Sequence, residues 1–172
     1  MKSLSLIILA FVALTMVSCS SNDSSNNKNA YVGNAEELLP WVNNGNFKEV
    51  KMENHPFAFF VDSASEYSYG YKMKVANIKV KDFKKITVSC DGYLYQTPSN
   101  VQLVIDIKNE GNNLFWQGEH FDKTITEASK WGKVTFTVDK PKDLNPNCEI
   151  LVYAWSQSRE AALFDNLTVQ FE

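Results

Sequence analysis

The chain has 172 residues, of which 17 are lysine or arginine and 20 are aspartate or glutamate, giving a net charge of −3. Only one basic residue, Arg159, is an arginine. A slightly acidic chain without a basic patch lacks the charge that holds a phosphate backbone, so we expect no nucleic-acid partner. The three cysteines form no CxxC pair and no Cys/His cluster of the kind that binds zinc.

The first 18 residues have the composition of an export signal. Lys2 precedes an apolar run over residues 4–17, which is too short to cross about 30 Å of hydrocarbon as a permanent helix. Residues 16–19 resemble a lipobox, in which the cysteine is acylated and becomes the first mature residue. We therefore predict a lipoprotein signal peptide over residues 1–18, with Cys19 lipidated. The alternative is an ordinary secretory signal followed by an incidental cysteine.

The residues after Cys19 predict a linker and then one domain. Residues 20–29 contain no apolar side chain and cannot bury enough surface to offset their ordering entropy. We expect a lipid-anchored flexible tether over residues 19–33 and a single domain over residues 34–172, attached to the outer membrane on its periplasmic or cell-surface face. A short helical turn is predicted over residues 35–39.

The rest of the chain alternates polar and apolar residues with the period of two that is typical of strands. The alternation is clearest over residues 66–77, where five side chains share one predicted face: Tyr67, Tyr69, Tyr71, Met73 and Val75. Further strands are predicted over residues 47–52, 57–61, 86–90, 101–108, 114–117, 133–138, 148–155 and 163–171. About nine short strands without a long amphipathic helix predict an all-β fold, a two-sheet antiparallel β-sandwich of the jelly-roll type.

Two cysteines fall on predicted strands. Cys90 and Cys148 form a disulfide only if their Cα atoms lie within about 7 Å of each other. Otherwise each is a small buried hydrophobic residue. Both alternatives remain open at this point.

Several segments resemble a known family. Residues 44–47 (NGNF) and 164–169 (FDNLTV) resemble the opening motif and the closing strand of jelly-roll carbohydrate-binding modules of the galactose-binding-like type. Residues 131–138 and 151–155 resemble two strands that lie between them. The resemblance implies a non-catalytic domain that binds glycans. Residues 62–64 (DSA) also resemble an O-glycosylation acceptor of Bacteroidetes, which suggests a lipoprotein of that group.

Many modules of this family hold a structural calcium ion between an opening glutamate and a closing aspartate. Asp165 matches the aspartate, and its parity with Leu163 and Leu167 points it into the core, where a carboxylate needs a partner. The glutamate is not matched, because Lys48 follows Phe47. Asp165 is thus either a calcium ligand or a carboxylate satisfied by a lysine or by backbone amides. No other cofactor is predicted.

Such modules bind sugars on exposed aromatic rings flanked by polar side chains. Residues 148–155 are apolar on both strand faces, so that one face meets the core and the other lies under a neighbour or forms a ligand surface. The carbohydrate-binding candidates are aromatic residues with polar neighbours, and the arginine: Trp155, Trp116, Tyr153, Tyr95 and Arg159. The alternative for each ring is a place in the core.

Catalysis has little support in the sequence. His55 and His120 have no partner motif, and the chain contains no GxSxG, HExxH or P-loop. Glu119 and Asp122 would have to lie about 5–9 Å apart across one sugar to hydrolyse a glycoside, and no catalytic residue is predicted.

Three functions remain compatible with these patterns. The first is a surface-anchored lipoprotein that binds glycans non-catalytically. The alternative is a structural or partner-binding lipoprotein that contacts another envelope protein through an exposed apolar face. The third is a glycoside hydrolase.

Overall fold

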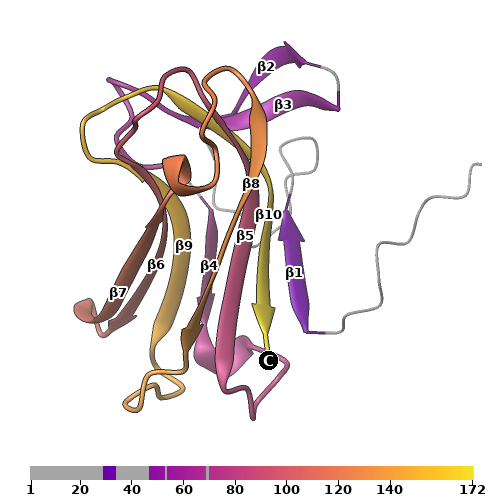
Figure 1. Cartoon of the computed structure of the whole chain (residues 1–172). Helices are drawn as coiled ribbons and strands as arrows, with labels where there is room; N and C mark the ends of the chain where they lie inside the picture. Colours follow the sequence, from indigo (N-terminus) through magenta and orange to yellow (C-terminus); the bar gives the residue numbers. More distant parts are fainter. Residues whose placement is uncertain (1–28, 34–46, 53, 69) are drawn as a thin grey trace, which may run out of the picture.

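The strands form two layers (Figure 1), and their alternating side chains place apolar residues between these layers. The structure is a computed structural model that describes residues 29–33, 47–52, 54–68 and 70–172. Within these ranges it contains ten strands and no α-helix. None of the helical segments described is long and apolar enough to span a membrane. The predicted all-β, two-sheet antiparallel β-sandwich is confirmed.

Sheet A has the strand order β2-β3-β10-β5-β8, and β1 pairs with β10 outside this path. Its strands are β1 (Ala30–Gly33), β2 (Phe47–Met52), β3 (His55–Val61), β5 (Lys85–Leu94), β8 (Trp131–Asp139) and β10 (Ala162–Phe171).

Sheet B has the strand order β4-β9-β6-β7. Its strands are β4 (Tyr71–Lys74), β6 (Val101–Asn109), β7 (Asn112–His120) and β9 (Glu149–Ser156). Two 3-10 turns, η1 (Val75–Asn77) and η2 (Phe121–Lys123), complete the described elements.

Strand β1 corrects the predicted boundary of the tether. Its four residues fall within the predicted tether, yet they pair with β10, and Tyr31 packs its ring 5.4 Å from that of Tyr71 and 5.9 Å from that of Phe171. Aromatic packing on the core offsets the entropy of ordering this short strand. Ala30 is therefore already part of the sandwich. The signal peptide, Cys19 and the predicted helical turn lie outside the described residues.

The core lies between the two sheets and contains both remaining cysteines. Cys90 and Cys148 are fully buried free thiols, so they are small core residues and form no disulfide with each other. Burial raises the pKa of the Cys90 thiol above its ordinary value. The strand β6 is buried along most of its length on both faces.

The regular alternation predicted for the β4 region breaks between Tyr67 and Tyr71. Tyr67 pairs with Trp155, whereas Tyr71 pairs with Val152, so the register shifts by one residue between the two pairs. A shift of one residue turns the side chains that follow to the opposite face. Tyr71 accordingly lies in the core, 1% exposed, while Tyr67 is 53% exposed on the outer face. The prediction that these tyrosines share a face was wrong.

A bulge in β10 changes the direction of Asp165 in the same way. Between two positions paired with β5, β10 has one residue more, and Asn166 in this bulge has a φ of 51°. Asp165 therefore lies on the outer face of sheet A beside Leu163, whereas Leu167 and Val169 face the core. The predicted parity of Asp165 with Leu167 was wrong, because it assumed an unbroken strand.

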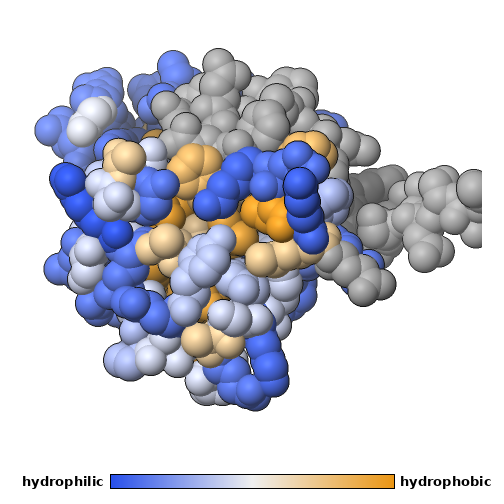
Figure 2. Space-filling model, turned by 90° about the horizontal axis from the view of Figure 1, so that it is seen from above, coloured by the Kyte–Doolittle hydropathy of each residue, from blue (hydrophilic) through white to orange (hydrophobic). Residues whose placement is uncertain are grey.

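Asp165 fastens the β2–β3 hairpin to the outer face of sheet A. The Nδ1 atom of His55 lies 2.9 Å from one oxygen of Asp165, and the backbone N–H of Asn166 donates to the other at 2.7 Å. The His55 ring stacks on Trp131 with centroids 3.9 Å apart, and the indole N–H of Trp131 donates to the Met52 sulfur. Figure 2 shows this end of the sandwich, where apolar residues gather in the middle and hydrophilic residues border them.

These contacts do not fit a calcium ion at Asp165. Calcium takes about six to eight oxygen ligands, whereas both carboxylate oxygens here face nitrogen atoms. The part of the chain that the structure describes also holds no group of three or more His, Cys, Asp or Glu side chains arranged for a metal. Of the predicted alternatives, a backbone amide satisfies Asp165, together with a histidine in place of the expected lysine.

The backbone at Gly70 lies against the backbone of β9. We therefore predict that only glycine is tolerated at position 70. A Cβ at Gly70 would stand 1.9 Å from the carbonyl oxygen of Val152, so the backbone must move to admit any side chain. We expect Gly70→Ala to lower the free energy of unfolding by about 2–4 kcal/mol, measured by urea denaturation. The control, Gly111→Ala, meets no atom within 4 Å but has a φ of 85°, and should cost about 1 kcal/mol. Equal losses in the two variants would contradict the close approach.

The hairpin contact predicts a stability that depends on His55 and not on calcium. Because His55→Ala removes one partner of a carboxylate that is 1% exposed, we expect the free energy of unfolding to fall by about 1–3 kcal/mol. His120→Ala on β7 serves as the control and should cost less. Thermal denaturation of the wild type should give the same midpoint in calcium and in EDTA, and a midpoint raised by calcium would contradict the assignment.

Candidate functional site

The outer face of sheet B carries its side chains in rows that cross the strands. The register gives three rows: Tyr67–Trp155–Gln102–His120, Tyr153–Val104–Gly118, and Lys72–Leu151–Asp106–Trp116. Gly118 leaves space in the middle row, since a Cβ there would stand 2.2 Å from the Gln102 side-chain oxygen and 3.2 Å from the Trp116 ring, and the flexible Gln102 side chain would have to shift. The missing side chain lets large groups from the outer rows lean over the middle one.

Four aromatic rings gather on this face and contact one another. Trp116 meets Trp155 edge to face at 5.7 Å, and Trp155 lies parallel to Tyr67 at 6.1 Å. Tyr67 in turn meets Tyr153 at 5.9 Å with the planes 70° apart. Trp116 is 41% exposed and Tyr67 is 53% exposed, while the other two rings are half-buried. The rings thus present apolar faces to solvent from β7, β9 and the segment before β4.

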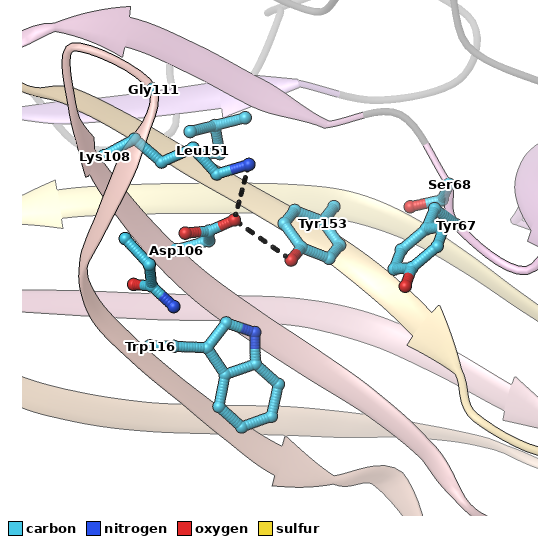
Figure 3. A pocket seen from close by; sticks show the side chains of 9 residues that line it. Tyr67, Ser68, Asp106, Lys108, Gly111, Trp116, Leu151 and Tyr153 are labelled. Carbon is cyan, nitrogen blue, oxygen red and sulfur yellow. Dashed lines mark hydrogen bonds and ion pairs between the residues drawn. The ribbon is translucent and has the colours of Figure 1, made fainter.

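Three of these rings, those of Tyr67, Trp116 and Tyr153, line a cleft of about 580 Å³, which we call the aromatic cleft (Figure 3). Its lining residues are Tyr67, Ser68, Asp106, Lys108, Gly111, Asn113, Trp116, Leu151 and Tyr153. A second hollow continues from it over Trp155. The cleft combines apolar rings with a few convergent polar groups, which is the composition of ligand-binding sites.

Polar contacts at the rim hold one of the rings in place. The indole N–H of Trp155 donates to a carboxylate oxygen of Glu66 at 2.9 Å. The guanidinium of Arg159 lies 3.8 Å from the other oxygen of Glu66. The backbone N–H of Ser156 also donates to the Glu66 carbonyl at 2.9 Å. Trp155 therefore has a fixed orientation before any ligand arrives.

A carboxylate lies at the floor of the cleft. Asp106 is 5% exposed, and its Oδ2 atom accepts a hydrogen bond from the Tyr153 hydroxyl at 3.3 Å. The Lys108 ammonium lies 3.4 Å from the same oxygen. Burial, with the charge of Asp106, raises the pKa of Tyr153 to about 12. Tyr153 consequently stays protonated at neutral pH and remains a donor to Asp106.

The structure brings four of the five predicted sugar-binding candidates together. Trp116 and Tyr153 line the cleft, Trp155 lines its continuation, and Arg159 lies at the rim. Tyr95 lies elsewhere, 5.1 Å from the Tyr93 ring and 5.9 Å from the Lys48 ammonium of β2. Of the two apolar faces of β9, the inner one, with Ile150, Val152 and Ala154, is fully buried, and the outer one carries Leu151, Tyr153 and Trp155, which are half-buried.

Two residues of the cleft were missed by the sequence analysis. Tyr67 was placed on the same face as Tyr71, because the register shift before Tyr71 has no signal in the alternation. Asp106 lies among polar residues on its strand, and its cross-strand neighbours Trp116 and Leu151 follow only from the pairing. The sequence shows that Asp106 is on a polar strand face and that Tyr67 is aromatic. It does not show that the two residues lie close together in the folded chain.

The acidic residues considered for hydrolysis have other roles. Glu119 forms an ion pair with Lys123 at 2.7 Å, and Asp122 accepts a hydrogen bond from the backbone N–H of Ser99 at 2.9 Å. Neither residue lines the aromatic cleft. His55 lies on the other sheet, in the contact with Asp165.

Comparison with known proteins supports the fold and not a family membership. No protein-family model and no curated protein sequence matches the chain. Among solved structures, the chain is similar to the CBM22-2 xylan-binding domain of Xyn10C from Paenibacillus barcinonensis, with a TM-score of 0.54 and 8% identity over 83% of this chain and 99% of that one. It is also similar to the C-terminal family 22 carbohydrate binding module of Clostridium thermocellum Xyn10B, with a TM-score of 0.50 and 7% identity over 86% and 96% of the two chains.

A longer structure also matches. It holds the CBM22-1 and GH10 modules of Clostridium thermocellum Xyn10B with xylohexaose, and the TM-score is 0.48 at 13% identity over 84% of this chain. This chain covers 28% of that structure, so it corresponds to less than a third of its length. Taken with the topology, the similarity to the CBM22-2 domain at a TM-score of 0.54 shows that the chain has the jelly-roll β-sandwich fold seen in that module.

Proposed function

We propose that this protein binds glycans without transforming them and that the aromatic cleft is the binding site. The observation that carries the proposal is the group of four contacting rings, three of which line an open cleft while Trp155 lines its continuation. Two of the four rings are more than two-fifths exposed. Aromatic rings combine a large apolar face with low conformational entropy, and they pack against the apolar faces of sugar rings. Exposure of such large apolar groups is costly unless a ligand covers them.

The fold supports the same class of ligand. A similar structure is named as a xylan-binding domain, and another is named as a carbohydrate binding module. We therefore take a polysaccharide such as xylan as the ligand to test first. Because one fold hosts many functions, the rings and not the fold carry the argument for this chain.

The proposal includes attachment to a membrane through Cys19. The apolar run over residues 4–17, the cysteine that follows it and the polar stretch over residues 20–29 support this part from the sequence alone. A lipoprotein cysteine carries more than one acyl chain, which is enough for stable attachment. A glycan-binding domain held in this way would capture polysaccharide at the outer membrane.

Removal of an exposed ring from the cleft should weaken binding. We expect Trp116→Ala and Tyr67→Ala each to lower the affinity for a bound polysaccharide by about tenfold or more, because each variant deletes a stacking surface near the centre of the site. Affinity gel electrophoresis against arabinoxylan, glucomannan and hydroxyethyl cellulose, followed by calorimetry with xylohexaose, measures the loss.

Tyr95→Ala is the matched control for these variants. Tyr95 is 44% exposed, close to the 41% of Trp116, but it lies outside the cleft. The variant should bind like the wild type, and all three variants should keep the wild-type melting temperature within a few degrees. Binding that falls equally in Tyr95→Ala would contradict the assignment to the cleft, and a wild type that binds no polysaccharide would contradict the function.

Lipidation at Cys19 has a direct test. The full chain expressed in a bacterium that processes lipoproteins should incorporate an alkyne-labelled fatty acid and sediment with membranes. Cys19→Ser should do neither, because it removes the acylated thiol, while Ser20→Ala should behave like the wild type. Equal labelling of Cys19→Ser and wild type would exclude this anchor.

A further inference from the structure

One oxygen of Asp106 has no protein partner. The Oδ2 atom lies near the Tyr153 hydroxyl and the Lys108 ammonium, but the Oδ1 atom is buried and accepts no hydrogen bond from any residue in the described ranges. A buried carboxylate oxygen that lost its water and gained no donor raises the free energy of the unliganded protein. Such an atom in a cleft is a place where a ligand donor is favoured.

The position of Asp106 determines from which side a ligand can bring a hydrogen-bond donor to its carboxylate. The side chain projects from the outer face of β6, between Leu151 of β9 and Trp116 of β7 in the same cross-strand row. Figure 3 shows it between Lys108 and Trp116, with the Tyr153 hydroxyl directed at it from the neighbouring strand. Because the Oδ1 atom is itself buried, a ligand reaches it only if a neighbouring side chain moves. Lys108 is an exposed neighbour of the carboxylate, with 40% of its side chain accessible and its ammonium 3.4 Å from Oδ2. The donor therefore arrives through the cleft, next to the Trp116 ring.

The charges around the cleft determine which class of ligand can supply the hydrogen-bond donor to Asp106. Ionised carboxylates only accept hydrogen bonds, so the ligand must supply an O–H or N–H group. The basic side chains at the cleft are already paired: Lys72 with Glu149 at 3.5 Å, Lys108 with Asp106 at 3.4 Å and Arg159 with Glu66 at 3.8 Å. An anionic group would thus face the Asp106 carboxylate in a partly desolvated site without a free cation among these three.

We propose that Asp106 is the specificity-determining residue of the aromatic cleft and that it selects uncharged sugars. Its Oδ1 atom accepts a hydrogen bond from a hydroxyl of the sugar that stacks beside Trp116, and its charge excludes uronate-rich and other polyanionic glycans. The inference rests on the proposed glycan-binding function and narrows it to neutral polysaccharides.

The test combines two substitutions with two classes of probe. The neutral probes are arabinoxylan, glucomannan and hydroxyethyl cellulose, and the anionic probes are polygalacturonate, alginate and carboxymethyl cellulose. We expect the wild type to bind at least one neutral probe about tenfold or more tightly than every anionic probe. Asp106→Leu should weaken neutral binding by about tenfold to a hundredfold, since it removes a charge-assisted acceptor.

Stability separates this role from a purely structural one. Because the substitution also removes a buried oxygen without a donor, Asp106→Leu should keep or raise the melting temperature while binding falls. If Asp106→Leu does not fold, Asp106→Asn carries the test: the same shape without the charge should weaken neutral binding and narrow the preference over anionic probes. Asp139→Leu, at an exposed carboxylate on sheet A, is the control and should change neither property.

The outcomes distinguish this inference from the proposed function. Neutral binding that is lost in Trp116→Ala and unchanged in Asp106→Leu and Asp106→Asn would overturn the role of Asp106 and leave the cleft as the glycan site. Equal or tighter wild-type binding to an anionic probe would overturn the selection of uncharged sugars. A wild type that binds neither class of probe would overturn the function and the inference together.

Discussion

The pairing of β6 with β7 on one side and β9 on the other determines the position of the strand-borne side chains in the aromatic cleft. The inward residues of β6, Leu103, Ile105 and Ile107, are fully buried between the sheets. A slip of one residue in either pairing would bring these apolar side chains to the outer face, so the register is strongly specified. Apolar burial on the inner face thereby places Asp106 beside Trp116 on the outer face.

Two buried carboxylates, those of Asp165 and Asp106, have different roles in the molecule. Asp165 lies under a hairpin, where an imidazole and a backbone N–H occupy its oxygens, and its position contributes to the fold. Asp106 lies under an open cleft, where one oxygen has partners and the other accepts no hydrogen bond from the described residues. Burial alone does not distinguish them, since both are at most 5% exposed. The distinction comes from which polar atoms surround each oxygen.

Much of the fold could be predicted from the sequence, because period-two alternation is a local property. The nine predicted strands occur, although the strand predicted over residues 66–77 is shortened to β4, and the second apolar face of β9 lies on the outer side of sheet B. Bulges are not local: the shifts near Gly70 and at Asn166 depend on which strand lies alongside, and each reversed the predicted direction of nearby residues. For the same reason the sequence identified several rings of the cleft but not Tyr67 or Asp106.

The chain enters the sandwich on the side opposite the aromatic cleft. The first strand, β1, joins sheet A, whereas the cleft lies on the outer face of sheet B, the opposite layer (Figure 1). Packed sheets are about 10 Å apart, so the thickness of the whole domain separates the two. The cleft therefore lies on the face of the sandwich opposite the sheet that β1 joins, so a long polymer can lie across the cleft without contacting β1.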